Sequence, residues 1–220
     1  MTPIYIRKSM IETYKWCPYQ YYLTYIDKIP IPVTYAMVLG TRFHDFAEQF
    51  FDISEPSTIS LEGYTEHEKP LYEWFVAYEQ IRKNKVKNYL PYALEIKLQS
   101  ERLLLSGTID RIDIEDDSTY TVVEYKTGKK IDDNSIVRQC SLYKLLIEDT
   151  LPIHISKYRA INPRIKEVRE YEINERDIKK TLQDIELVRE ANTFKKSCSL
   201  FKYPYCKMCT IDDLIDENII

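Results

Sequence analysis

Two apolar-rich segments in the middle of the chain, residues 103–114 and 120–126, alternate apolar and polar positions with a period of two. This is the pattern of strands that bury one face, and the acidic cluster at 115–118 between them predicts an antiparallel hairpin. Further strands are expected at 93–98, 153–161 and 167–173.

Apolar residues recur at helical spacing before, between and after these strands. A first helix is expected after Ser9, with a capping-box signature at 9–12 and a break or kink at Pro18. A second is expected to bury Leu39, Phe43, Phe46, Ala47 and Phe50, and a third, around 70–87, to bury Leu71, Trp74, Phe75, Tyr78 and Ile81. Later helices are expected at 134–148 and 175–191. This order of elements predicts an α/β fold with a central mixed sheet.

The spacing of the hairpin decides which side chains share a face of the sheet. If the turn centres on Asp117, Asp110 lies opposite Glu124. The same register places Thr108 opposite Lys126. Because side chains alternate along a strand, all four point to one face, and a slip of one residue would move Asp110 to the other.

Two carboxylates that oppose each other on one face repel, so Asp110 and Glu124 are expected to need a cation between them. Mg²⁺ or Mn²⁺ suits this role, because hard divalent cations bind carboxylate oxygens, polarise a phosphoryl oxygen and acidify a bound water. The ammonium group of Lys126 would orient that water or offset developing charge. Since 30% of the residues are charged, spacing alone favours an ordinary solvated strand face.

The motifs around the hairpin reverse that preference. In chain order they are Cys17-Pro18 within residues 9–22, Gly40-Thr41-Arg42-Phe43-His44, Gly107-Thr108-Ile109-Asp110, VEYKTGK at 123–129, and Gln139-Cys140-Ser141-Leu142-Tyr143. Together they resemble the PD-(D/E)XK nuclease superfamily, and specifically its RecB-like branch. That branch includes the CRISPR-associated Cas-four exonucleases and the nuclease domains of recombination helicases. The resemblance spans most of the chain and implies a restriction-endonuclease-like core with helices flanking the sheet.

The resemblance also implies a set of metal ligands for Mg²⁺ or Mn²⁺. The set comprises His44, Asp110, Glu124 and the carbonyl oxygen of Tyr125, with Glu95 as a supporting carboxylate. Lys126 would assist the attacking water. Without the family context, a lone histidine on a helix is more often a core-edge or surface residue. A neutral imidazole beside two carboxylates suits Mn²⁺ in particular.

Gln139 and Tyr143 are four residues apart, so on the expected helix they share a face. On spacing alone, a partly exposed helix face is an equal alternative. The resemblance places both toward the metal site, where the amide would bond a phosphate or the attacking water and the tyrosine would stack on a base. Lys129, Lys130 and Arg138 are expected to contact nucleic acid, whereas the basic cluster at 82–87 is expected to be a solvated face.

Five cysteines stand at positions 17, 140, 198, 206 and 209, and the pair Cys206 and Cys209 has metal-ligand spacing. Many relatives hold a 4Fe-4S cluster, and Cys17, Cys206 and Cys209 match three of its four ligand positions. The usual last cysteine is missing, so Cys198 is expected to substitute, with Zn²⁺ second to 4Fe-4S and reduced thiols as the alternative. Such a site would tie residues 1–35 and 192–220 into a subdomain around a core of 36–191. Cys140 is expected to be a packing residue.

Composition is compatible with one nuclease domain. With 220 residues, 44% of them hydrophobic, the chain can bury a substantial core. It has no bilayer-spanning apolar run and no signal sequence, so we expect a cytoplasmic protein, in the host cell if viral. The net charge of −4 argues mildly against a protein that coats nucleic acid, although not against a local grip on one strand.

The sequence as a whole predicts a Mg²⁺- or Mn²⁺-dependent deoxyribonuclease for single-stranded DNA or DNA ends, an exonuclease with endonuclease activity left open. One alternative is a non-catalytic nucleic-acid-binding or scaffolding subunit that retains the nuclease fold. Another is a structural domain in which the motifs are coincidental. A homo-oligomer and a DNA-processing partner protein are both compatible with the chain.

Overall fold

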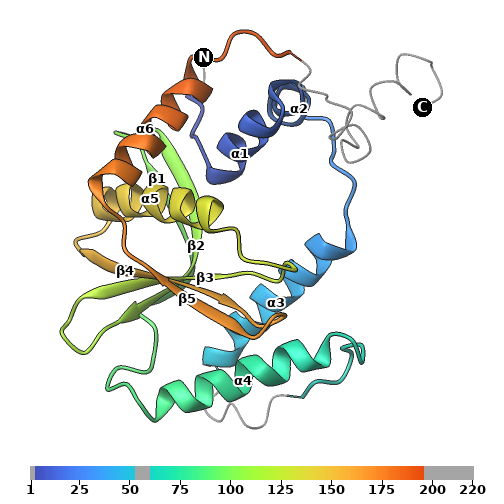
Figure 1. Cartoon of the computed structure of the whole chain (residues 1–220), viewed down its shortest axis with the longest axis vertical. Helices are drawn as coiled ribbons and strands as arrows, with labels where there is room; N and C mark the ends of the chain where they lie inside the picture. Colours follow the sequence, from blue (N-terminus) through green and yellow to red (C-terminus); the bar gives the residue numbers. More distant parts are fainter. Residues whose placement is uncertain (1–2, 53–59, 196–220) are drawn as a thin grey trace.

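The computed structural model describes residues 3–52 and 60–195, and its centre is a five-stranded mixed sheet (Figure 1). The strands are β1 (Ala93–Ser100), β2 (Leu105–Ile114), β3 (Tyr120–Tyr125), β4 (Ile155–Asn162) and β5 (Glu167–Tyr171). They lie side by side in chain order. β3 and β4 are parallel, and the other neighbouring pairs are antiparallel. The predicted mixed sheet is therefore confirmed.

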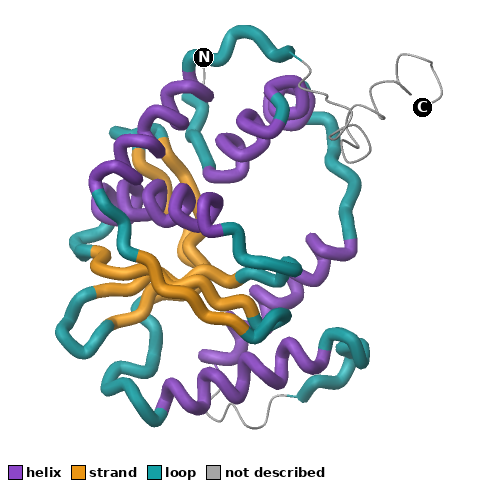
Figure 2. The backbone as a smooth tube through the Cα atoms, viewed as in Figure 1, coloured by secondary structure: helices purple, strands orange, loops and turns teal. Residues whose placement is uncertain are grey.

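Helices cover both faces of this sheet (Figures 1 and 2). Before the strands come α1 (Lys8–Trp16), α2 (Pro18–Tyr21), the π-helical turn η1 (Tyr22–Ile26), α3 (Tyr35–Asp52) and α4 (Lys69–Lys83); α5 (Asp133–Thr150) joins β3 to β4, and α6 (Glu175–Arg189) follows β5. A parallel strand pair needs a crossover connection, and α5 supplies it. α1, α5 and α6 lie on one face, and α3 and α4 on the other.

The apolar stripe of α3 packs against the sheet and α4. All five of its predicted members, Leu39, Phe43, Phe46, Ala47 and Phe50, are buried, which confirms the expected face. Phe43 contacts Phe75 of α4 and Tyr125 of β3 edge to face, with ring centroids 5.2 and 5.4 Å apart. Such edge-to-face pairs add specificity to the apolar contact. This packing fixes the position of α3 against β3 and β4, and with it the position of His44 at the edge of the stripe.

The prediction of which α4 residues face inward is wrong at the C-terminal end of the helix. Ile81 is 57% exposed, whereas Glu79 and Arg82 of the same helix are buried. Arg111 of β2, fully buried, points at α4 and donates to Glu79 over 2.8 Å, and Arg82 donates to the other oxygen of Glu79 over 2.7 Å. A buried arginine needs a buried counter-charge, so the charged residues take the inner positions and Ile81 turns outward.

The predicted capping box at residues 9–12 is also wrong. α1 begins at Lys8, one residue earlier, with Arg7 at the N-cap position and no side-chain cap. Glu12 instead lies 2.7 Å from Lys8 and accepts a hydrogen bond from Ser135 of α5. This contact ties the first helix to the crossover helix. Pro18 starts α2, so the expected break there is confirmed.

Three of the four predicted cysteine ligands, Cys198, Cys206 and Cys209, lie outside the described residues, as does most of the predicted subdomain segment 192–220. Cys17, between α1 and α2, is buried, and Cys140 is buried in the apolar core of α5, as expected for a packing residue. Within the described ranges, none of the helices combines the length and apolar character needed to span a membrane.

Candidate metal centre

The β2–β3 hairpin has the register that the sequence predicts. Arg111 faces Val123 and Asp113 faces Thr121. One step further along the same register, Asp110 lies opposite Glu124. The acidic turn and the two alternating runs are thus sufficient to predict the pairing, since a slip of one residue would move the apolar side chains of a strand to the opposite face.

The neighbouring strand β1 adds a third carboxylate to this row. Leu94 faces Arg111 and Ile96 faces Ile109, so the residue between them, Glu95, lies opposite Asp110. Glu95, Asp110 and Glu124 therefore stand in line across three adjacent strands. Like charges in cross-strand positions destabilise a sheet unless a cation lies among them.

α3 places His44 against this row. Its Nδ1 atom lies 3.0 Å from Oε1 of Glu95 and 3.5 Å from Oδ1 of Asp110. Ligand atoms of His44, Glu95 and Asp110 all lie within 4.8 Å of one another. The three line an open cleft of about 740 Å³, together with Thr108 and Lys97. Lys97 is not among the residues that the sequence motifs predict here, although its place two residues after Glu95 on β1 puts it on the same face.

Glu95 has an unusual backbone conformation for a strand residue, with a φ of 43°. Residues other than glycine rarely adopt this left-handed region, which costs on the order of 1–3 kcal/mol. The strained residue is also the one whose carboxylate contacts His44. Backbone strain of this kind concentrates at functional sites, where the surrounding structure holds it in place.

The site has an excess of buried negative charge. Asp110 and Glu124 are only 5% and 6% exposed. Burial and the charge of Glu124 raise the pKa of Asp110 well above its usual value, although His44 and the N–H of Tyr125, which donates to Oδ2 over 2.7 Å, act the other way. Oε2 of Glu124 is buried without a hydrogen-bond partner among the described residues. An unpaired buried carboxylate oxygen costs free energy that a divalent cation would recover. Carboxylate oxygens with one imidazole nitrogen fit Mg²⁺ or Mn²⁺.

His44 and Lys126 both remain charged in this acidic surrounding. Burial alone would lower the pKa of His44, but its hydrogen bond with Glu95 and the charges of Asp110 and Glu124 raise it to about 9. Burial would likewise lower the pKa of Lys126, but the charge of Glu124 and the hydrogen bond to it raise it. In the absence of metal, the two cations partly neutralise the row of carboxylates.

Lys126 is held at the end of a chain of hydrogen bonds. Its Nζ donates to Oε1 of Glu124 over 2.6 Å and to the amide oxygen of Gln139 over 3.0 Å. The amide nitrogen of Gln139 donates to the hydroxyl of Tyr143 over 3.0 Å, and this hydroxyl donates to the carbonyl of Thr108 over 2.6 Å. β2 therefore fixes the orientation of the lysine through two side chains of α5.

Tyr143 does not lie where base stacking requires it. Tyr143 is 6% exposed and Gln139 is 4% exposed, and their polar groups are bonded within the protein. Both residues hold Lys126 in position through their hydrogen bonds, and the burial of Tyr143 does not support its predicted stacking on a base. The predicted contact of Gln139 with a phosphate or the attacking water stays a prediction. Gly107 allows this arrangement, since a Cβ there would lie 2.9 Å from Cε1 of the Tyr143 ring.

The predicted basic cluster separates into two parts. Arg138 lies 3.0 Å from Asp184 of α6 and 3.8 Å from Glu12 of α1. Because its charge is paired inside the helical layer, its predicted contact with nucleic acid is not supported. Lys129 and Lys130 are exposed on the loop that follows β3, and their predicted contact with nucleic acid stays a prediction.

Comparisons with known proteins agree with this geometry. A family model described as "PD-(D/E)XK nuclease superfamily" matches residues 8–214. A comparison with curated proteins gave no match. The chain is similar to the crystal structure of a protein of Eubacterium rectale described as a "Putative exonuclease", with a TM-score of 0.55 and 12% identity. The similarity covers 89% of this chain and 85% of that one. At this identity it shows a common fold.

Proposed function

The chain belongs to the PD-(D/E)XK nuclease superfamily, and from that premise we propose that it is a Mg²⁺- or Mn²⁺-dependent deoxyribonuclease of the RecB-like branch. The observation that carries the proposal is the grouping of His44, Glu95 and Asp110 within 4.8 Å, beside the unpartnered carboxylate oxygen of Glu124. The restriction-endonuclease-like fold brings these residues together from one helix and three strands.

Each residue has a definite role in this proposal. Nδ1 of His44 and carboxylate oxygens of Asp110, Glu95 and Glu124 would hold the cation, with the Tyr125 carbonyl as a further predicted ligand. A bound divalent cation polarises a phosphoryl oxygen and acidifies a water. Lys126, fixed by Glu124 and Gln139, donates to the attacking water or to the phosphate oxygens on which charge develops. Attack on phosphorus is in line with the bond that breaks.

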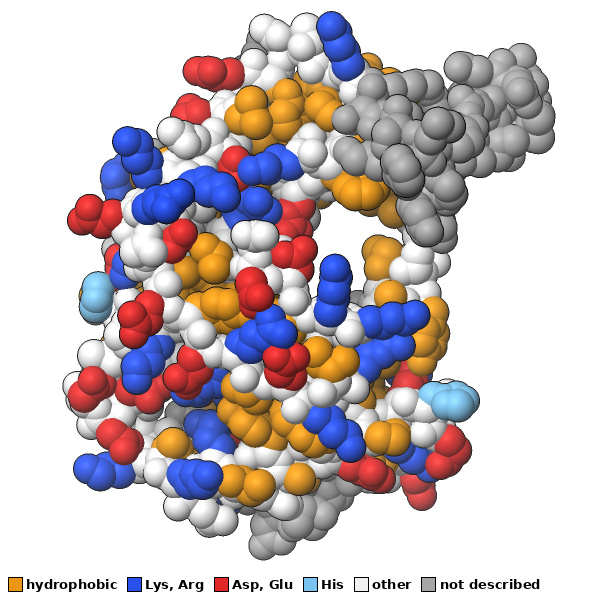
Figure 3. All heavy atoms as spheres, viewed as in Figure 1, with side chains coloured by type: hydrophobic (Ala, Val, Ile, Leu, Met, Phe, Trp, Pro, Cys, Tyr) orange, Lys and Arg blue, Asp and Glu red, His pale blue; other side chains and the backbone are white. Residues whose placement is uncertain are grey.

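The shape of the molecule favours a single strand with a free end as substrate. Figure 3 shows an opening between the N-terminal helices and α3. In Figure 1 the segment 27–34 runs from η1 to α3 along this opening, and the loop after β3, which carries Lys129 and Lys130, lies on the other side. A flexible strand can enter an opening of this kind end first, whereas a stiff duplex would have to be separated before it could pass. Single-stranded DNA and frayed ends are therefore the preferred substrates in this proposal.

An assay on labelled single-stranded DNA tests the proposal. With Mn²⁺ or Mg²⁺, the protein should degrade linear strands and spare circular ones, and EDTA should stop the reaction. Labels at the 5′ and 3′ ends separate the two polarities of digestion. A protein that binds these strands but cleaves none of them with any divalent cation would instead be the non-catalytic subunit. The intact set of carboxylates and lysine argues against that alternative.

The cysteine site stays a prediction. Cys17 is the one predicted ligand within the described residues, and its burial suits a ligand at the edge of the N-terminal helices. Iron and zinc analysis of anaerobically purified protein, with its absorbance spectrum, decides between 4Fe-4S, Zn²⁺ and reduced thiols.

Metal binding at neutral pH should release protons, and His44 should contribute one of them. In the metal-free protein the raised pKa of His44, about 9 against an ordinary 6.5, stabilises the fold fully below about pH 6.5. That contribution is lost as the pH rises through about 9. An imidazole must be neutral to bind metal, so the affinity for Mn²⁺ should increase across the same range.

Titration calorimetry in buffers of different ionisation enthalpy measures this proton release. His44→Gln should release about one proton fewer than the native protein. His154→Gln, a change at an exposed histidine outside the cleft, should release as many protons as the native protein. Equal release by the native protein and His44→Gln would remove His44 from the ligand set.

A further inference from the structure

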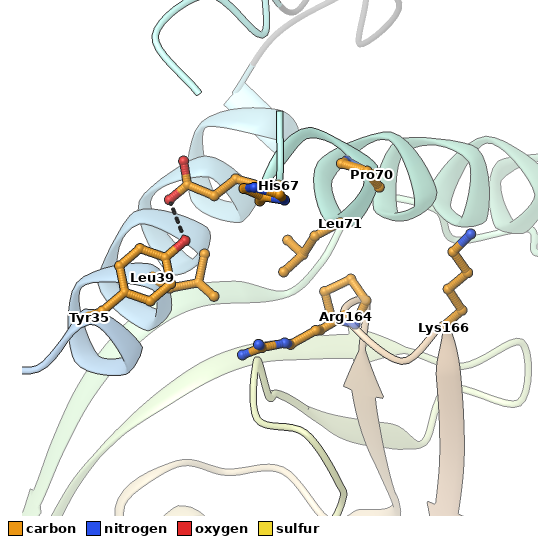
Figure 4. Close-up of a pocket in the computed structure, with 9 residues that line it drawn as sticks. Tyr35, Leu39, His67, Pro70, Leu71, Arg164 and Lys166 are labelled. Carbon is orange, nitrogen blue, oxygen red and sulfur yellow. Dashed lines mark hydrogen bonds between the residues drawn. The ribbon is translucent and has the colours of Figure 1, made fainter. Parts of the chain in front are cut away.

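A second concave site lies on the other side of α3 from the metal cleft (Figure 4). Tyr35 and Leu39 are one helical turn apart on α3 and border this cavity, whereas Met37, Gly40 and His44 border the metal cleft. The cavity has a volume of about 460 Å³, which lies in the range of ~300–1,000 Å³ found for small-molecule sites. Its other walls are the start of α4 and the turn between β4 and β5.

The acidic member of this cavity is neutralised within the protein. Glu68 is 2% exposed, and its carboxylate lies 3.1 and 3.2 Å from Nη1 of Arg42. The backbone N–H of Thr65 donates to it over 2.9 Å, and the hydroxyl of Tyr35 lies 3.5 Å away. Glu68 is therefore a satisfied structural group, and its charge does not cancel that of the cations across the cavity.

The basic residues across the cavity from Glu68 keep N–H groups that can bind a ligand. Arg164 and Lys166 line the cavity from the β4–β5 turn, and His67 lines it from the start of α4. In Figure 4 the guanidinium of Arg164 extends beneath Tyr35 and Leu39, whereas Lys166 extends toward α4. All three basic residues are exposed, and neither Arg164 nor Lys166 makes an ion pair among the described residues. Nη1 of Arg164 donates to the carbonyl oxygen of Thr127 over 3.3 Å, which leaves the other N–H groups of the guanidinium for a ligand.

The β4–β5 turn is linked directly to the loop that follows Lys126. Besides the contact of Arg164 with Thr127, the amide of Asn162 donates to the carbonyl of Gly128 over 3.0 Å. This loop also carries Lys129 and Lys130. A strand that leaves the metal centre along the loop would therefore pass the two exposed lysines and arrive at Arg164.

We propose that this cavity binds a nucleotide of the substrate strand at a distance from the scissile bond. The inference rests on the proposed nuclease function. Arg164 and Lys166 would each contact a phosphate of the strand, Arg164 through the fork of its guanidinium and Lys166 as a point charge. The ring of Tyr35, 60% exposed, and the side chains of Leu39 and Leu71 would receive the base. The affinity for a DNA strand would then depend on its length, because a short strand cannot reach both the metal centre and this cavity.

The test uses the full chain with Asp110→Asn, so that binding is measured without cleavage. Fluorescence anisotropy in EDTA gives Kd for labelled single strands of about 4 and about 16 nucleotides. These two lengths bracket the usual number of nucleotides that a single-strand binding domain covers. Adding Arg164→Ala and Lys166→Ala should weaken binding of the longer strand about tenfold or more and leave the shorter one unchanged. The slope of log Kd against log salt should fall by about 1.4, because two phosphate contacts are lost.

Matched variants separate this site from general charge effects. Lys179→Ala with Lys180→Ala removes the same charge from the exposed face of α6 and should leave the length dependence intact. Tyr35→Ala should weaken binding of the longer strand about tenfold, whereas Tyr35→Phe should keep the stacking surface and the native Kd. Circular dichroism melts establish that each variant is folded.

Two outcomes have different meanings. If Asp110→Asn binds no single strand of either length and the native protein cleaves none, the proposed function fails. If the native protein cleaves DNA but the Arg164 and Lys166 changes alter neither the Kd of the longer strand nor its salt slope, the second site is overturned and the nuclease stands. Equal weakening by the α6 pair would also overturn it.

Discussion

Asp110→Asn should lower kcat for DNA cleavage by about 10³-fold or more while the protein stays folded. Oδ1 of Asp110 faces His44 and Oδ2 accepts the N–H of Tyr125. Asparagine keeps the shape of the side chain and an oxygen for that hydrogen bond, but it loses the negative charge that a cation needs. Rates on labelled single strands with saturating Mn²⁺ measure the effect.

The same change should stabilise the metal-free fold at neutral pH. Burial and the charge of Glu124 raise the pKa of Asp110 in the folded protein, so the folded state holds the carboxyl proton more tightly than the unfolded state does. This proton binding stabilises the fold fully at a pH below the ordinary pKa of an aspartate. The stabilisation is lost as the pH rises through the raised pKa. The amide introduced by Asp110→Asn does not ionise, so melting in EDTA should occur at a higher temperature than for the native protein. Glu172→Gln, at an exposed position on the protein surface, should alter neither rate nor melting. Full cleavage by Asp110→Asn would reject the metal site.

Arg111→Met should lower the free energy of unfolding by about 3–5 kcal/mol, since it leaves buried carboxylates without a counter-charge. Arg111 is fully buried and lies 2.8 Å from Glu79 and 3.0 Å from Asp113. It also donates to the hydroxyl of Tyr125 over 2.9 Å. Equilibrium unfolding in urea gives the change in free energy.

Two controls distinguish a buried ionic network from general surface effects. Arg176→Met, at an exposed position of α6, should change the free energy of unfolding by no more than about 0.5 kcal/mol. Combining Arg111→Met with Glu79→Met should recover part of the loss, because both members of a buried pair are then apolar. A loss below about 1 kcal/mol for Arg111→Met alone would contradict the network.

Local patterns were sufficient for the hairpin and for the inner face of α3. The acidic turn fixes the β2–β3 register, and that register brings Asp110 opposite Glu124. The spacing of large apolar residues on α3 likewise identifies its buried side, which leaves His44 at the edge. Both features depend on residues that are close together in the sequence, where periodicity is informative.

Contacts between distant segments could not be predicted in the same way. The left-handed backbone of Glu95 and its contact with His44 depend on how α3 lies on the sheet. The burial of Tyr143 depends on Gly107 of a different element. Helical spacing places Arg138 on a face, but only the packing of α1 and α6 on α5 shows that its charge is already paired.

The segment 27–34 has a mechanical consequence for the proposed enzyme. It connects η1 to α3 beside the opening, so continuous backbone would close one side of the path of a DNA strand that lies in the opening (Figure 1). If the proposed enzyme threads its substrate, the strand would be kept from leaving sideways between successive cuts. Digestion would therefore be processive, with many nucleotides released per encounter, and the residence time on DNA would be set by strand length rather than by the strength of any single contact.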